Sequence, residues 1–310
     1  MRWTSLLLLA PLAGCTVFDG LEAAADGTAS VSLPTTGATD EDAGELVAVA
    51  NEDGGTRCVG GSAFASIAEL PGSVNAQPIN AGLALSQDET TIYFVPFGKS
   101  GMARARRPTT IDRFGDAEPL VLGANEYGFE PYLSLDGKTL YFSRGGGADG
   151  RIGRADVSTS SASLVVDSLP SDVAVATPFL DVPNKAFYSV AYGLPARELG
   201  TLVDGHWEAK ASLRVSANGA ALATRAPVLS NDGLTIYFAA ETPVPDAPAR
   251  MVVYVARRAS RVAEWQTPTP VAGLTTTSWV PAWLSPDGCR LYLSNVFQGG
   301  WKAFVATLAG

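Results

Sequence analysis

The sequence predicts an all-β fold, a five-bladed β-propeller with four-stranded antiparallel blades. A short apolar motif recurs five times at spacings of 47 to 55 residues, which is the length of a propeller blade. A second pattern, an aromatic residue six positions before an aliphatic one, repeats independently of the first. The folded part begins with this second pattern and ends without it. The two ends of the chain can therefore complete one blade and close the ring.

Composition supports a chain that turns often and buries a core. Hydrophobic residues make up 46% of the 310 residues and charged residues 17%, with 32 Gly and 20 Pro. The net charge of −9 is uneven, because residues 16–56 hold nine acids and no Lys or Arg. From Arg57 onward, 22 acids (31 − 9) stand against 21 bases (22 − 1, the other being Arg2). With no basic stripe, nucleic acid is excluded as an expected partner.

Residues 1–14 are predicted to be a lipoprotein signal peptide. Met1-Arg2 precedes a short apolar stretch of roughly ten residues, which is too short to span a bilayer. The stretch ends in Leu12-Ala13-Gly14-Cys15, which resembles the lipobox of bacterial lipoproteins, L-[AS]-[GA]-C. This resemblance implies that Cys15 is acylated and becomes the mature N-terminus. Thr16 after it implies the outer membrane. The alternative is an ordinary secretory signal with a chance cysteine.

Residues 15–56 are predicted to be the lipidated cysteine and a flexible acidic tether. Asp, Glu, Ala, Gly, Ser and Thr dominate this segment, and neither a strand nor a helix period persists. The propeller is expected over residues 57–310, as a monomer that reaches the membrane only through its lipid anchor.

The recurring apolar motif is predicted to form the two inner strands, A and B, of each blade. In the second copy, Asp136-Gly137 supplies a tight turn between Leu133 and the triplet Leu140-Tyr141-Phe142. The triplet is apolar on both faces, as a strand between neighbouring blades must be. The third copy is degenerate. The copies begin at Leu85, Leu133, Leu180, Leu229 and Leu284.

The aromatic-to-aliphatic pattern is predicted to form the outermost strand, D, because even spacing places both residues on one face. It covers residues 64–70, 114–120, 207–213 and 265–271, and residues 163–169 fill the third position without an aromatic. Strand C candidates lie at 151–155, 251–255 and 302–306. Because no D pattern follows the last C strand, we expect residues 64–70 to pair with it.

The repeat S-x-D-G-x-x-L-Y-F, with an Asn and a Glu-Pro upstream, resembles the TolB-like (WD40-like) propeller repeat of bacterial envelope proteins. The second copy matches best, from Asn125 through Glu130-Pro131 to Phe142, and the resemblance covers residues 62–308. It implies a propeller of the cell envelope. The count of five blades departs from this family, whose propellers usually have six.

Two cysteines remain once Cys15 is acylated, and an even pair in an oxidising compartment favours a disulfide. Cys289 lies in the A–B turn of the last blade, and Cys58 lies just before the strand expected to close that blade. Both positions fall on one face of a four-stranded blade. We therefore expect a Cys58–Cys289 bond; two free thiols are the alternative.

The sequence gives catalysis little support, and we expect no enzyme, no cofactor and no metal site. The only histidine, His206, lies in a turn, so the serines lack a His-based triad. Glu130 is the candidate carboxylate of the central funnel, because it begins an innermost strand. Its expected counterparts, which are not acidic, are Gly82, Thr177, Ala226 and Val280.

One face of the propeller is expected to bind a partner, because the D–A and B–C loops that share it carry exposed aromatic residues. Packing of the same side chains is the alternative. We expect a non-catalytic envelope scaffold for protein–protein interaction; a carbohydrate-binding or glycoside-hydrolase propeller using the funnel, and a spacer without ligand, are the other hypotheses. The candidate face consists of Phe97, Tyr127, Phe129, Glu130, Tyr192, Trp279 and Phe297.

Overall fold

The computed structural model describes residues 48–50, 56–58, 64–76, 78–97, 101–122, 128–145, 150–158, 164, 166–182, 184–192, 197–245, 247–297 and 300–308. The chain divides into compact units 1–37 and 38–310, and the described residues all belong to the second. The predicted signal peptide and Cys15 lie outside them. In this part of the chain, no helix is long and apolar enough to cross a membrane.

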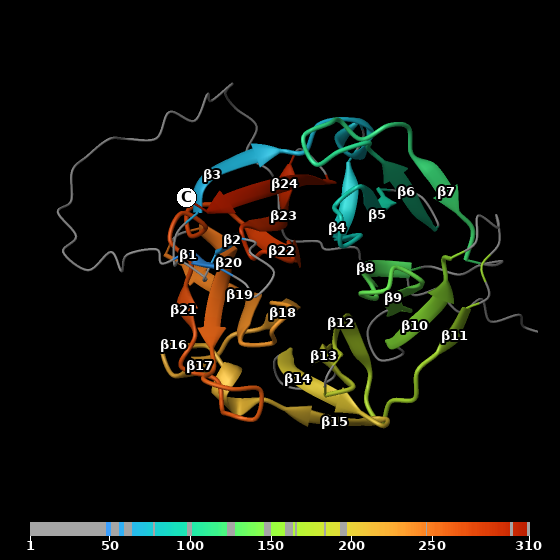
Figure 1. The fold of residues 1–310 in the computed structure, drawn as a ribbon. Helices are drawn as coiled ribbons and strands as arrows, with labels where there is room; N and C mark the ends of the chain where they lie inside the picture. Colours follow the sequence, from blue (N-terminus) through green and yellow to red (C-terminus); the bar gives the residue numbers. More distant parts are fainter. Residues whose placement is uncertain are drawn as a thin grey trace, which may run out of the picture. The chain divides into compact units, whose positions relative to one another are not determined.

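Five blades of antiparallel strands surround a central axis, as the repeat predicts (Figure 1). Each blade is a meander in which strand A is innermost and strand D outermost. From inside to outside the blades are β4 (Ile79–Leu85), β5 (Thr91–Pro96), β6 (Met102–Arg106), β7 (Glu118–Leu120); β8 (Gly128–Leu133), β9 (Thr139–Arg144), β10 (Arg151–Asp156), β11 (Val166–Ser168); β12 (Val175–Asp181), β13 (Ala186–Ala191), β14 (Glu198–Val203), β15 (His206–Ala209); β18 (Thr224–Leu229), β19 (Thr235–Val244), β20 (Ala247–Arg257), β21 (Thr269–Pro270); and β22 (Trp279–Leu284), β23 (Arg290–Phe297), β24 (Gly300–Leu308), β3 (Phe64–Glu69).

Two short hairpins lie outside the blades. One pairs β16 (Ser216–Ala217) with β17 (Ala220–Ala221), and the other pairs β1 (Ala48–Ala50) with β2 (Thr56–Cys58). Strand β1 falls inside the segment expected to be tether. Backbone pairing with β2 needs no side-chain period, so the pattern of residues 15–56 could not indicate this strand.

The first outer strand closes the ring. Strand β3 pairs with β24, with Ala68 opposite Val305 and Ile67 opposite Ala306, and the two strands lie side by side in Figure 1. A disulfide joins Cys58 to Cys289, with a Cα–Cα distance of 5.1 Å. The Cys58 amide also donates to the Asp287 carbonyl at 2.9 Å. The start of the described chain is thus held on the last blade by backbone and sulfur alike.

The A–B turns use the Ser-x-Asp motif as a structural device. In the second blade, the Ser134 hydroxyl and the Lys138 amide both donate to Asp136 Oδ1, at 2.6 and 3.1 Å. The hydrogen bond from Ser134, followed by that from the Lys138 amide, holds the pKa of Asp136 below its ordinary value. Three of the other four turns repeat these bonds, at Asp88, Asp232 and Asp287.

The interpretation of the aromatic-to-aliphatic pattern as one face of strand D is wrong for three blades. Strands β7 and β21 begin after Phe114 and Trp265, and Leu213 lies in a 3₁₀ turn rather than in a strand with Trp207. Phe114 and Trp265 are buried for another reason. The guanidinium carbons of Arg107 and Arg258 lie over their rings, each 4.4 Å from the ring centroid.

These arginines connect neighbouring blades. Arg258 donates from Nε to the Gly233 carbonyl of its own A–B turn at 2.7 Å, and its Nη2 lies 3.3 Å from Asp181 of the preceding blade. Arg107 makes the equivalent bond to the Glu89 carbonyl at 2.8 Å and reaches the Tyr292 hydroxyl of the preceding blade at 3.1 Å. In these two blades, the aromatic residue of the pattern, Phe114 or Trp265, therefore marks a contact between neighbouring blades.

The hydrophobic core is divided among the blade interfaces, with a separate cluster between each pair of neighbours. The cluster between the second and third blades is the smallest, with Ile152, Val175 and Leu202 as its buried members. This interface involves the blade whose repeat is degenerate in sequence. Weak repeat identity and a small apolar contact thus occur together.

Candidate functional site

The innermost strands enclose a small, open hollow on the propeller axis. All five blades line it. Each A strand has a bulge here, where its register with strand B shifts. The bulge residues Glu130, Thr177 and Ala226 have φ values of 51, 52 and 53°, and Gly82 has 96°. This conformation is uncommon outside glycine and recurs around the hollow.

Strand register corrects one predicted counterpart of Glu130. In the last blade Val280 pairs with Ser294 just as Phe129 pairs with Ser143, so Val280 corresponds to Phe129. Pro281 is the counterpart of Glu130. Because proline cannot adopt a positive φ, this blade lacks the left-handed residue that the other four have.

Glu130 is a half-buried carboxyl group that lines the hollow. Burial raises its pKa, against the hydrogen bond from Ser143 and the charges of Arg225 and Arg197, which lower it. The Ser143 hydroxyl donates to Glu130 Oε2 at 2.8 Å. Gly82 makes room for this residue, since a Cβ there would lie 2.7 Å from the Glu130 Cα.

Ser143 also links Glu130 to the next blade, because it accepts a hydrogen bond from the Thr177 amide at 2.8 Å. Thr177 is itself 4% exposed and lines the hollow. Its hydroxyl oxygen is buried and has no hydrogen-bond partner in the described part of the chain. An unsatisfied buried hydroxyl is unfavourable, so this atom favours a ligand or water at the site.

Two arginines and a tyrosine complete the group. Arg225, 8% exposed, is on β18, and burial followed by the neighbouring charge of Arg197 lowers its pKa, while Glu130 acts in the opposite direction. The Arg197 guanidinium lies over the Tyr192 ring, 5.2 Å from its centroid. Burial, and then the charge of Glu130, raises the pKa of the Tyr192 hydroxyl. These mutual effects place four groups from three blades in one electrostatic cluster.

The cluster contains charges of both signs. The charges of Arg225 and Arg197 act on Glu130, and the charge of Glu241 acts on Arg225. Glycoside hydrolysis by the common routes uses a pair of carboxylates. Glu130 supplies one, and Glu241 contributes only a charge that acts on Arg225.

The structure separates the predicted face into different groups. Phe97 is 45% exposed, and Phe129 and Tyr192 are half-buried, on the side where the A strands begin. Trp279 instead packs in the core, with its ring 5.1 Å from that of Phe304. Tyr127 lies outside the described residues. Phe297 is placed as the last residue of β23, opposite Gly300, and nothing is described of its side chain.

Sequence reasoning missed Arg197 and Arg225. Arg225 occupies the position that Phe129, Ala176 and Val280 fill in other blades. A charged residue among apolar counterparts in an innermost strand was therefore a usable signal. Arg197 lies in a loop without a repeated pattern, so no comparable signal existed for it.

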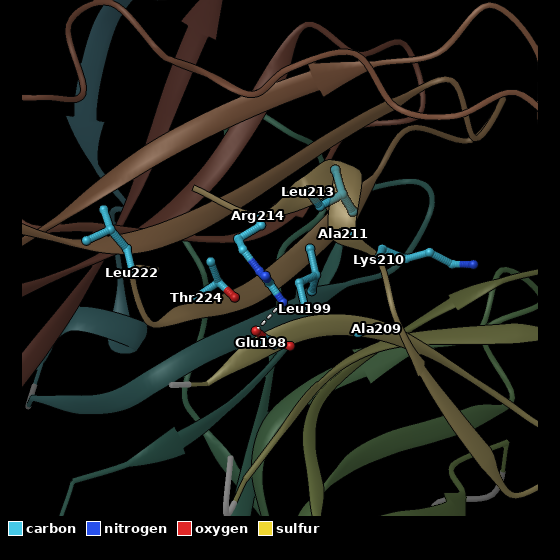
Figure 2. A pocket seen from close by; sticks show the side chains of 9 residues that line it. All are labelled: Glu198, Leu199, Ala209, Lys210, Ala211, Leu213, Arg214, Leu222 and Thr224. Atoms are coloured by element: carbon cyan, nitrogen blue, oxygen red, sulfur yellow. Dashed lines mark hydrogen bonds and ion pairs between the residues drawn. The ribbon is translucent and has the colours of Figure 1, made fainter. Parts of the chain in front are cut away.

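A second hollow lies between the third and fourth blades. Figure 2 shows its lining, in which Arg214 pairs with Glu198 at 2.6 Å while Lys210 lies at one side. The Arg197 carbonyl accepts hydrogen bonds from the backbone and side chain of Thr224, which also lines this hollow. The charge of Arg214 in this hollow is therefore paired.

No family model matches the sequence, and no curated protein matches it. Solved structures do match. The endo-arabinase from Bacteroides thetaiotaomicron aligns at a TM-score of 0.54 and 9% identity, over 78% of this chain and 98% of that chain. TolB from Acinetobacter baumannii aligns at 0.42 and 17% identity, over 79% and 64%. A candidate TolB from Agrobacterium tumefaciens aligns at 0.48 and 13% identity, over 80% and 92%. The likeness to these structures is one of fold.

These matches correct one expectation. The prediction that the chain is not an enzyme is contradicted, because the same architecture is that of an endo-arabinase. The prediction rested on the fold and on missing histidine and carboxylate partners. A propeller fold hosts catalysis as readily as binding, so it cannot exclude an enzyme.

Proposed function

We propose that this chain is a cell-envelope lipoprotein whose propeller binds a partner protein at the face where the innermost strands begin. This face, called the channel face, consists of Phe97, Phe129, Glu130, Tyr192 and Arg197. The lipobox-like Leu12-Ala13-Gly14-Cys15 supports the lipid anchor, and the TolB-like repeat supports the envelope.

A difference between the two faces carries the proposal. On the face of the A–B turns, the aspartates accept hydrogen bonds from serines of their own turns. Arg258 on this face donates to the Gly233 carbonyl and pairs with the buried Asp181. The channel face has an exposed aromatic ring, that of Phe97, and half-buried charged groups, of which Glu130 lines the hollow. Aromatic and arginine side chains around a concave centre are typical of protein contact sites.

Affinity capture tests this proposal. The acylated chain, crosslinked in its native envelope, is expected to recover a partner that Phe97→Ala loses. Leu135→Ala is the matched control, because Leu135 is an apolar residue of the opposite face with 40% exposure. Recovery of no protein above background, or equal loss in both variants, would contradict the proposal.

The anchor and the competing activity need separate measurements. Labelled palmitate is expected to enter the wild-type chain and not Cys15→Ser, whose propeller should appear in the soluble periplasmic fraction. An unlabelled wild-type chain would rule out the anchor. Release of reducing ends from arabinan, abolished by Glu130→Gln, would replace the binding proposal with a glycoside hydrolase.

A further inference from the structure

Two blades present loops that are built alike and end in an aliphatic tip. These loops, residues 107–114 of the first blade and 258–265 of the fourth, connect strands C and D. Each contains a four-residue turn closed by a backbone hydrogen bond, of 3.2 Å in the first blade and 3.0 Å in the fourth. The third residue of the turn is Ile111 in one loop, 90% exposed, and Val262 in the other, 93% exposed.

The repetition of these tips distinguishes them from ordinary exposed aliphatic residues, which are common on protein surfaces. Turns of this kind are usually filled by Gly, Pro, Asn, Asp or Ser, whose local chemistry suits the bend. Ile111 and Val262 occupy the same turn position in two different blades. A residue that departs from its local rule in the same way twice indicates a use outside the fold.

Contacts at the base of each loop hold both tips on the face of the A–B turns. Arg107, which begins the first loop, donates to the Glu89 carbonyl of an A–B turn at 2.8 Å. Arg258, which begins the other loop, donates to the Gly233 carbonyl of an A–B turn at 2.7 Å. Each guanidinium group also stacks on the aromatic ring that ends its loop. The two tips therefore project from one face of the propeller.

The charges beside the tips are balanced. Asp112 and Arg113 follow one tip, and Arg261 and Glu264 stand on either side of the other. Both acids accept hydrogen bonds from hydroxyl groups, at 2.6 and 2.9 Å. The aspartates of the A–B turns add negative charge to the same face. This balance favours a zwitterionic surface over an anionic one, which attracts clusters of Lys and Arg.

The chain joins the propeller on this same face. The Cys58 amide donates to the Asp287 carbonyl, and the disulfide joins Cys58 to Cys289, in the A–B turn of the last blade. That blade stands between the fourth and the first in the ring (Figure 1). Roughly 30 residues separate Cys15 from Ala48, and a coil of that length spans on the order of 30 Å. An anchor at Cys15 thus keeps this face within reach of a bilayer.

We propose that the face of the A–B turns docks on a phospholipid bilayer, with Ile111 and Val262 inserted between the lipids on either side of the anchored chain. This inference rests on the lipid anchor of the proposed function. Aliphatic side chains gain free energy in the boundary between headgroups and acyl chains. Because the anchor already holds the chain at the membrane, two such contacts suffice to orient it. The channel face then points away from the bilayer, toward the partner protein.

The test measures the exposure of the tips on vesicles of phosphatidylcholine that carry the acylated full chain. Ile111→Cys and Val262→Cys are labelled one at a time with the fluorophore NBD, and the native disulfide is left oxidised. Phe97→Cys, labelled in the same way on the channel face, is the reference. We expect iodide to quench the tip labels at least about threefold less than the reference, and acyl-chain nitroxides to quench only the tip labels. Tip labels as open to iodide as the reference would overturn the inference.

A second substitution tests whether the two tips act together. Val262→Ser in the chain labelled at position 111 is expected to restore most of the iodide quenching, because one tip alone holds the face weakly. Val121→Ser is the matched control and should leave the label protected. Val121 is 48% exposed and follows β7 at the other end of the first blade. Equal effects of the two substitutions, or protection that requires anionic lipid, would contradict insertion of apolar tips.

The outcomes keep this inference apart from the proposed function. A wild-type chain that takes up no palmitate would remove the anchor and the docking together. An acylated chain whose tips stay exposed on vesicles would remove the docking alone and leave the proposed function intact. A benzophenone attached to Ile111→Cys is expected to crosslink to phospholipid in the native envelope. A crosslink to a protein instead would replace the bilayer by a protein contact.

Discussion

At the scale of the residue, Glu130 shows how a repeated position acquires a single special use. The other blades fill this bulge position with Gly82, Thr177, Ala226 and Pro281, so the backbone conformation does not require a carboxyl group. The burial that raises the pKa of Glu130 also makes its ionised form unfavourable in the folded state. Such a residue lowers stability, which is typical of a site kept for binding or chemistry.

Glu130→Gln is therefore expected to raise the urea midpoint of unfolding at pH 7. A carboxyl group whose folded pKa lies above its unfolded value binds more protons in the folded state, so wild-type stability rises as the pH falls toward the ordinary value of 4.5. The variant should lack this rise. Tryptophan fluorescence in urea at several pH values measures it, and a lower midpoint for the variant at pH 7 would contradict the assignment.

Glu118→Gln is the control with the opposite sign. The hydrogen bond and charge of Arg104 hold the pKa of Glu118 below its ordinary value, so this carboxylate stabilises the fold above that value and loses its effect on acidification. The variant should be slightly less stable than wild type at pH 7, and its stability should fall less than that of wild type when the pH is lowered.

At the scale of the element, the repeat predicts strands A and B well and strand D poorly. Strands A and B are short, apolar and joined by Ser-x-Asp-Gly turns, so local chemistry defines them. The rings of Phe114 and Trp265 are buried by Arg107 and Arg258, each of which also contacts the preceding blade. Spacing alone cannot identify such a contact, although both arginines stand seven residues before their rings.

Arg258→Met is expected to destabilise the propeller by about 3 kcal/mol, because it leaves Asp181 buried beside a weaker partner. The side chains of Arg258 and Asp181 are 5% and 2% exposed, and Arg261 approaches the same carboxylate at 3.5 Å. Urea unfolding measures the loss. The control is Arg154→Met, which breaks an exposed ion pair and should cost less than about 1 kcal/mol.

A double variant distinguishes a buried charge left alone from a lost packing contact. Arg258→Met with Asp181→Leu replaces both charges by apolar groups, and it should be more stable than Arg258→Met alone. If the free energy of unfolding falls in the double variant by as much as the sum of the losses in the two single variants, the ion pair is not the source of the effect.

At the scale of the whole molecule, ring closure was the most predictable feature and the binding cluster the least. Closure follows from the order of strand types along the chain, which sequence displays directly. The cluster of Glu130, Arg197 and Arg225 depends on how three blades meet at the axis. Glu130 and Arg225 lie at repeated positions of innermost strands and could be predicted without that geometry, whereas Arg197 could not.

The closure brings residues 231 positions apart into one blade, where the Cys58–Cys289 disulfide joins them. A bond across so long a loop restricts the unfolded chain strongly, so Cys58→Ser with Cys289→Ser should lower the free energy of unfolding by up to about 5 kcal/mol. Dithiothreitol should lower the midpoint of wild type toward that of the double variant and leave the variant itself unchanged. Strand β3 and the Cys58 amide still hold the last blade without the sulfurs, so the variant should remain folded in the absence of urea. An unchanged midpoint in the variant would mean that backbone pairing alone closes the ring.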